Sequence, residues 1–290
     1  MKISISAATD IGHGRENNED AYVFCPNLSN PNWQFNQTKG FVNLDSAGAL
    51  LVIADGMGGA NAGEVASAIA IDTVRQAFLP QVVKEAAASE EQARTLLNNA
   101  IIQADEAINK RMWECPETSG MGTTIVACWL TPAKAYVAWC GDSRCYVYNK
   151  TDGLRSLTKD HSYVQELIDR GELTEEEAFT HPENNVITRG LGDFDTKAQP
   201  DIVVYPVHAG DTFLLCTDGL CGYCNNEKIE EVIAGYEDST DKCADMLLQA
   251  ALDASSEDNI CIAIATVLDD DDSEKQTPSK LQRFFKNIFG

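Results

Sequence analysis

Hydrophobic and polar residues alternate along the chain in two kinds of pattern. Segments rich in β-branched and aromatic residues predict strands, and they read KISISAAT, DAYVFC, ALLVIAD, GTTIVACWL, KAYVAWCGDSRCYVYN, DTFLLCTDG and NICIAIATV. Apolar residues at helical spacing predict helices over residues 63–78, about 90–112, 163–170, 226–234 and 240–254. Together these segments predict a mixed helix and strand fold.

The predicted strands follow one another across short turns instead of alternating with helices. A turn at Thr131–Pro132 joins two of them, and turns at Gly141 and at Asp152–Gly153 indicate two further hairpins. Such runs favour an α+β sandwich with antiparallel sheets over a doubly wound parallel sheet. The Asn-rich stretch from Pro26 to Gly48 is expected to be a surface insertion between two strands.

Composition narrows the class of protein. The chain has 290 residues, with 44% hydrophobic and 23% charged, which is typical of a soluble globular protein. There are 45 acidic residues against 22 lysines and arginines, giving a net charge of -23. Such a surface repels nucleic acid phosphates, so no nucleic acid partner is expected. Some of the acidic residues are candidates for holding metal ions.

The cysteines and the chain ends indicate a cytoplasmic protein. The chain carries ten cysteines, and most of them lie inside apolar runs, where cysteine behaves as a small hydrophobe. The first residues form no signal peptide, and no stretch resembles a membrane span. The thiols are therefore expected to be reduced and structural. The CGYC stretch at Cys221 has no second CxxC and is weak support for zinc or redox chemistry.

Several aspartates stand beside the ends of predicted strands. Asp55 ends an apolar run and is followed by glycines, and Asp142 falls in the predicted hairpin turn at Gly141. Three more sit beside strands, and these are Asp20, Asp218 and Asp258. One such residue is usually a turn former or a helix cap. Several that converge would repel one another unless cations neutralise them, and hard oxygen ligands favour Mg²⁺ or Mn²⁺.

These motifs carry a resemblance to a known family. The stretches GRENNEDAYV, VIADGMGGANAGEVAS, GMGTTIVA, WCGDSRCYVY, LLCTDGL and EDNICIAI occur in the order found in metal-dependent serine/threonine protein phosphatases of the 2C type. The chain resembles bacterial members most, over roughly residues 4–267. The resemblance implies an αββα sandwich, with two antiparallel sheets face to face, helices outside and metals at one edge. It implies a catalytic domain at 1–267, with a flap at about 160–190 that influences substrate choice.

The resemblance also assigns roles to individual residues. Asp55 would bridge two metal ions, and the carbonyl of Gly56 would bind one of them. Asp218 and Asp258 would bind one ion, while the second would be held by Asp20 and, directly or through water, by Glu19.

Three further positions carry over from the family. Asp142, together with Asp218, matches a third and weaker metal site of bacterial relatives. Arg15 matches the arginine that binds substrate phosphate, for which its planar fork is suited. Some relatives have a histidine two residues after the bridging aspartate, where this chain has Met57, which cannot donate a proton.

The function implied is hydrolysis of phosphoserine and phosphothreonine in phosphoproteins, by a water activated between two Mn²⁺ or Mg²⁺ ions. A cognate serine/threonine kinase is the partner that the family implies. Two alternatives stay open. One is a catalytically silent binding module on the same fold, which should have lost some of the ligands. The other is a metal-dependent phosphodiesterase, which the acidic surface disfavours.

Two groups of residues lie outside this constellation. The histidines show no metal-binding spacing and are expected to be structural; they are His13, His161, His181 and His208. A charged linker at 268–279 leads to 280–290, where Leu281, Phe284, Phe285, Ile288 and Phe289 would share one helical face opposite Lys280, Arg283 and Lys286. This tail could be a frayed end, dock on its own domain, bind a partner or lie on an anionic membrane.

Overall fold

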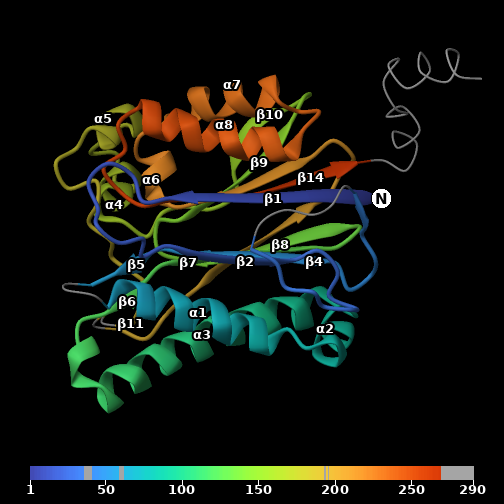
Figure 1. The fold of residues 1–290 in the computed structure, drawn as a ribbon, viewed down its shortest axis with the longest axis horizontal. Helices are drawn as coiled ribbons and strands as arrows, with labels where there is room; N and C mark the ends of the chain where they lie inside the picture. The colour runs from blue at the N-terminus through green and yellow to red at the C-terminus, as the bar shows by residue number, and fades with distance from the viewer. Residues whose placement is uncertain (36–40, 59–61, 193, 195, 269–290) are drawn as a thin grey trace, which may run out of the picture.

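The computed structural model describes residues 1–35, 41–58, 62–192, 194 and 196–268. Two antiparallel sheets pack face to face, and helices cover both outer faces (Figure 1). The predicted αββα sandwich is therefore confirmed. The predicted tail, and its linker after residue 268, lie outside the described residues. No helix in the described part of the chain combines the length and the apolar character that crossing a membrane requires.

One sheet is built around the first and last strands. It is six-stranded, in the order β10 (Gly153–Ser156), β9 (Arg144–Asn149), β13 (Thr212–Cys216), β14 (Ile260–Leu268), β1 (Lys2–Asp10) and β3 (Val42–Asn43). Strands β1 and β14 pair along their full length, from Lys2 opposite Leu268 to Asp10 opposite Ile260. The two ends of the described fold are thus tied together by one long ladder.

The second sheet is five-stranded. Its order is β12 (Asp201–Pro206), β8 (Lys134–Cys140), β7 (Ile125–Leu130), β4 (Ala49–Ala54) and β2 (Ala21–Cys25). All residues of β4 and β7 are buried, because one face meets the other sheet and the other face meets helices. This explains why both read as continuous apolar runs in the sequence. Between the sheets lie side chains that include Ile5, Ile53 and Phe213.

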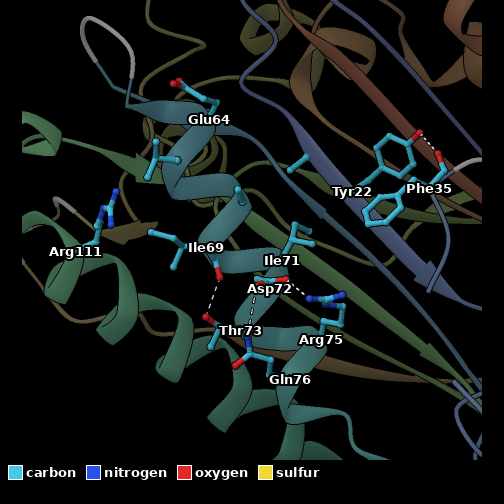
Figure 2. Close-up of a pocket in the computed structure, with 13 residues that line it drawn as sticks. Tyr22, Phe35, Glu64, Ile69, Ile71, Asp72, Thr73, Arg75, Gln76 and Arg111 are labelled. Carbon is cyan, nitrogen blue, oxygen red and sulfur yellow. Dashed lines mark hydrogen bonds and ion pairs between the residues drawn. The ribbon is translucent and has the colours of Figure 1, made fainter. Parts of the chain in front are cut away.

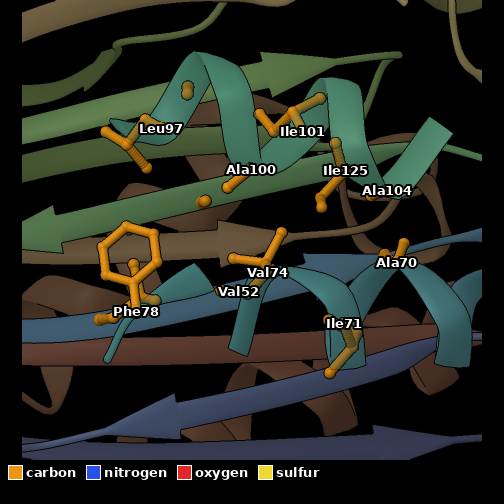
Figure 3. Close-up of a cluster of buried hydrophobic side chains, with 14 of the residues drawn as sticks. Val52, Ala70, Ile71, Val74, Phe78, Leu97, Ala100, Ile101, Ala104 and Ile125 are labelled. Carbon is orange, nitrogen blue, oxygen red and sulfur yellow. The ribbon is translucent and has the colours of Figure 1, made fainter. Parts of the chain in front are cut away.

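Helices close each outer face. Helices α1 (Gly63–Ala77), α2 (Pro80–Ala86) and α3 (Glu90–Glu114) cover the five-stranded sheet. Figure 3 shows the side chains of Val74 and Leu97 from these helices gathered with Ile125 of the sheet. On the other face lie α6 (Asp218–Cys221), α7 (Asn226–Gly235) and α8 (Thr240–Asp253). The short elements η1 (Pro116–Thr118), α4 (Tyr163–Asp169) and α5 (Glu175–Phe179) lie outside these layers.

A small third sheet lies at the end of the sandwich. It joins β5 (Gly56–Met57), β6 (Gly122–Thr123) and β11 (Leu191–Gly192). Strands β5 and β11 were not predicted, because two residues are too short for any periodic pattern. Strand β6 lies inside the predicted strand GTTIVACWL, which the structure divides at Thr124 into β6 and β7 (Ile125–Leu130). The sheet connects the segment after Asp55 with the end of the predicted flap.

Two of the three predicted hairpins are confirmed. Leu130 pairs with Ala135 across the turn at Thr131–Pro132, and Asn149 pairs with Gly153. The predicted hairpin at Gly141 is wrong, because β8 and β9 belong to different sheets. Gly141, with φ of 122°, carries the chain from one sheet to the other, and a Cβ there would lie 2.5 Å from the Cβ of Thr124. Only glycine fits this crossing.

Other boundaries also differ from the sequence patterns. The strand that starts at Thr212 ends at Cys216, because Asp218 already begins a helix. Strand β12 and helix α2 were not predicted. The stretch 26–48 contains the short strand β3 and two buried leucines, Leu28 and Leu44, so its described part also belongs to the fold.

Candidate metal centre

Five aspartates meet at one end of the sandwich because each stands where a strand begins or ends. Asp55 separates β4 from β5, and Asp142 lies in the crossing between the two sheets. The other three flank strands β2, β13 and β14, and they are Asp20, Asp218 and Asp258. Strand ends of stacked sheets share an edge, so residues far apart in sequence come together there.

Their mutual electrostatic influence shows that these carboxylates are neighbours. Burial raises the pKa of Asp55 well above its ordinary value, and the charges of Asp20 and Asp218 raise it further. Burial, followed by the charge of Asp258, raises the pKa of Asp218 to about 6. Burial also raises the pKa of Asp20, although a hydrogen bond from Thr217 opposes this rise. Like charges held together out of water disfavour ionisation.

Asp142, between β8 and β9, belongs to the same group of aspartates. It is 5% exposed. Burial raises its pKa well above the ordinary value, and Asp218 is the neighbouring charge with the largest further effect. The charge of Asp218 therefore acts on Asp142, while the third metal site stays a prediction.

Three of these carboxylates have an oxygen that is buried and unpartnered. Within the described residues, Oδ1 of Asp20, of Asp142 and of Asp218 accepts no hydrogen bond. Buried acceptors are nearly always satisfied, and a hard divalent cation is a partner that several carboxylate oxygens can share. The residues therefore fit such an ion.

The carboxylates do not complete a site by themselves. Among the described residues, no three acidic, histidine or cysteine side chains converge closely enough to hold a metal ion as they stand. Additional donors such as main-chain carbonyls and water are needed, and Mg²⁺ and Mn²⁺ commonly take both.

The glycines after Asp55 allow close approach of main chain. A Cβ on Gly56 would lie 2.2 Å from the carbonyl oxygen of Gly63 and 2.5 Å from that of Glu19. A Cβ on Gly63 would lie 2.5 Å from Oε2 of Glu19. Any side chain at these positions would displace Glu19 or the start of α1, so glycine is required here.

Arg15 lies at the exposed side of the acidic group. Its Nη2 donates to Oδ2 of Asp258 at 2.7 Å, while its side chain is 53% exposed. The hydrogen bond to Asp258 raises the pKa of Arg15, and the charges of Asp218 and Asp55 add to this effect. An exposed guanidinium with further donors can also bind a phosphate group.

Several residues that position this centre were not singled out in the sequence. Asn259 donates through Nδ2 to the carbonyls of Ile11 and Asn17, and its Oδ1 accepts from the N–H of Glu19 at 2.8 Å. It thereby fixes the segment that carries Arg15. Only its place in the EDNI stretch, next to Asp258, could have drawn attention to it.

Two threonines and a serine hold the main chain around Asp55. The hydroxyl of Thr123 donates to the carbonyl of Asp55 at 2.7 Å, and Oγ1 of Thr124 accepts from its N–H at 3.2 Å. Thr124 also exchanges a hydrogen bond with Ser143, next to Asp142. In the sequence, Thr123 and Thr124 are visible only as part of an apolar strand pattern.

His161 forms hydrogen bonds away from the acidic group. Its Nδ1 accepts from the N–H of Gly141 at 3.1 Å, so Nε2 carries the proton and donates to Asp201 at 3.0 Å. The other histidines also contact main chain or neighbouring side chains: Nε2 of His13 lies 3.2 Å from the Leu252 carbonyl, Nδ1 of His181 accepts from the N–H of Glu183, and His208 lies beside Asp211. None of these contacts places a histidine among the candidate metal ligands.

One cavity in the described part of the chain lies elsewhere on the surface. It has a volume of about 800 Å³ and lies along α1 and β2, with Tyr22, Phe35, Ile69 and Arg111 around it (Figure 2). None of the five aspartates lines it. The chemistry of the chain is therefore indicated by its charges and not by the size of a cavity.

Comparison with known proteins identifies the family. A sequence model described as "Protein phosphatase 2C" matches residues 6–260. This chain belongs to that family. It is 35% identical to a protein named serine/threonine phosphatase stp from Listeria innocua over 226 residues, which are 77% of this chain and 86% of the relative.

Solved structures of phosphatases share the fold. Serine/threonine phosphatase Stp1 from Staphylococcus aureus matches with a TM-score of 0.76 and 34% identity, over 91% of this chain and 95% of that one. The catalytic domain of the phosphatase PstP, solved with two manganese ions, matches with a TM-score of 0.72 and 29% identity, over 93% and 100%. The chain is therefore a serine/threonine phosphatase of the 2C type.

Proposed function

We propose that this phosphatase hydrolyses phosphoserine and phosphothreonine in proteins with two divalent cations, Mn²⁺ or Mg²⁺, bound between its aspartates. The observation that carries the proposal is the set of buried, unpartnered oxygens on Asp20, Asp142 and Asp218. The similarity to a PstP structure that contains two manganese ions supports it.

The ligands proposed are those that the family resemblance assigns. Asp55 would bridge the ions, and the carbonyl of Gly56, the next residue, would bind one of them. Asp218 and Asp258 would hold one ion. Asp20 and Glu19 would hold the other, and Asp142 with Asp218 would hold a third and weaker ion. When bound, the ions would supply an activated water as nucleophile and neutralise charge on the phosphoryl group.

The side chains of the chain itself would bind and orient the substrate. Arg15 would take two phosphoryl oxygens with its planar fork while Asp258 holds it in place. Met57 lacks a titratable group, so no proton passes through it. The Cys261 thiol takes no part, since burial raises its pKa well above the ordinary value and a neutral thiol is a poor nucleophile.

The test is hydrolysis of a serine phosphopeptide with Mn²⁺, with a chelator, and by the variant Asp218→Asn. We expect turnover with Mn²⁺, none with chelator, and at least a hundredfold loss in the variant. The exposed Asp245→Asn serves as the matched control and should behave like wild type. Turnover that survives in Asp218→Asn would refute the assigned centre. No turnover in the wild type would favour the silent binding module, and cleavage of single-stranded DNA would favour the phosphodiesterase.

The wider setting is also a proposal. We place the catalytic domain at 1–267, with residues 160–190 as the flap, and a serine/threonine kinase as the enzyme that this phosphatase opposes. Thr174 and Glu177 form a capping box at the start of α5, which lies inside the proposed flap. Comparing phosphoproteins in cells with and without the protein would identify the substrates and the kinase.

A further inference from the structure

A buried carboxylate outside the candidate metal centre has only hydrogen-bond donors around it. Asp105 of α3 is 3% exposed. Its Oδ1 accepts from the N–H of Gly192 at 2.8 Å and from Nδ2 of Asn109 at 2.9 Å. Its Oδ2 accepts from the N–H of Ala198 at 3.1 Å. Three donors thus meet on one side chain: one from α3 itself, one from β11 and one from the segment that precedes β12.

The position of Gly192 connects this carboxylate with the aspartates. Gly192 belongs to β11 and lies opposite Gly122 of β6. Gly122 lies opposite Met57 of β5, and Thr123 lies opposite Gly56. A continuous set of strand pairs therefore leads from the residue held by Asp105 to the proposed metal-binding carbonyl of Gly56.

Thr123 extends the connection to Asp55 itself. Its hydroxyl donates to the carbonyl of Asp55 at 2.7 Å, and the N–H of the next residue, Thr124, donates to the same carbonyl at 2.9 Å. A displacement of β6 would therefore move the main chain of Asp55.

Close packing leaves Gly192 little freedom. Its φ is 94°, and a Cβ there would lie 2.6 Å from the carbonyl of Met121 and 2.8 Å from Cγ2 of Ile108. The strand can approach β6 only in this conformation, and Gly192 is held there by the hydrogen bond that its N–H donates to Asp105.

We propose that Asp105 is a positioning residue for the phosphatase centre. It holds β11 against β6, and β6 in turn holds the main chain of Asp55 and Gly56 where the ions are proposed to bind. This inference rests on the proposed metal ligands. A carboxylate suits the position because it only accepts hydrogen bonds. An asparagine would turn its NH₂ group towards one of the three donors and leave that donor unsatisfied.

The experiment compares the full-length variants Asp105→Ala and Asp105→Asn with wild type. Glu106→Gln is the matched control for Mn²⁺ binding, because Glu106 is the next residue and is exposed. Glu106 lies 4.0 Å from Lys197, so the control for cleavage after Lys197 is Glu91→Gln, an exposed glutamate in the first turn of the same helix. The first measurement is the Mn²⁺ concentration that gives half-maximal hydrolysis of a phosphopeptide, together with calorimetric Mn²⁺ binding. The second is the rate of trypsin cleavage after Lys197 in metal-free protein.

We expect Asp105→Ala to raise the Mn²⁺ dissociation constant about tenfold, because losing a hydrogen bond to a buried charged group costs enough for such a change. Cleavage after Lys197 should accelerate, while turnover partly recovers at saturating Mn²⁺. Asp105→Asn should show a smaller change of both. Glu106→Gln should leave Mn²⁺ binding unchanged, and Glu91→Gln should leave the cleavage rate unchanged. If Asp105→Ala fails to fold, Asp105→Asn decides.

Two results would overturn the inference. One is faster cleavage with unchanged Mn²⁺ binding, because Asp105 would then anchor only its own loop. The other is no change in either measurement. If these occur while Asp218→Asn is inactive, the proposed function still stands. Hydrolysis by the wild type without divalent ions would instead refute the proposed function itself.

Discussion

Replacing Asp218 by asparagine is expected to stabilise the metal-free protein at neutral pH. Its pKa is raised from 3.8 to about 6 by burial and by the charge of Asp258, so folding forces an ionised group into an unfavourable site. A tenfold change in proton affinity corresponds to about 1.4 kcal/mol. The rise therefore corresponds to about 3 kcal/mol of lost free energy of unfolding, which asparagine should restore.

The pH at which this cost develops follows from the direction of the pKa change. The folded protein binds the proton of Asp218 more tightly than the unfolded chain does. The free energy of unfolding therefore falls as pH rises from about 3.8 to about 6 and is constant above that. The difference between variant and wild type should grow from about 1 kcal/mol near pH 4.5 to about 3 kcal/mol near pH 7.5.

Urea unfolding of the chelator-treated protein, followed by tryptophan fluorescence, measures this difference. Adding Mn²⁺ at a hundredfold excess over its dissociation constant should stabilise wild type by about 2.7 kcal/mol and the variant by much less. The exposed Asp245→Asn should follow wild type throughout. If metal-free Asp218→Asn is less stable than wild type, or if the difference in the free energy of unfolding does not vary with pH, the ionised carboxylates do not repel one another in the folded protein.

Three further predictions concern other residues. Arg15→Ala should raise the KM for a phosphopeptide about tenfold or more, and Arg15→Lys should recover only part of this because it lacks the fork that also binds Asp258; equal kinetics of Arg15→Ala and wild type would contradict the assigned role. Burial lowers the pKa of His161 below 6.5, so its stabilising contribution should be present above pH 6.5 and be lost as pH falls from 6.5 through the lowered pKa. A free energy of unfolding that depends on pH in the same way for wild type and His161→Gln, from about pH 7.5 to 5.5, would oppose this. Of the ten cysteines, only Cys115 is not buried, so a thiol reagent should modify one thiol in the native protein and the rest only after unfolding.

The local pattern of residues was enough to predict most of the helices and strands and to single out the aspartates beside strand ends. Burial of β4 and β7 on both faces leaves a continuous apolar run in the sequence, and the amphipathic helices show their periodicity directly. Asp55 stood out because an acidic residue ends such a run and glycines follow it. These are properties of neighbouring residues, so the sequence itself records them.

Which strands share a sheet was decided only in the tertiary structure. Nothing near Gly141 distinguishes a hairpin from a crossing between sheets, because the outcome depends on which strands β8 and β9 pair with. Strand β8 pairs with β7 and β12, and β9 pairs with β10 and β13. The contacts of Asp105 with Gly192 and Ala198 are likewise long-range. Hydrophobic periodicity indicates which face of a segment is buried, but not which other segment that face packs against. The packing of the whole core determines the partner.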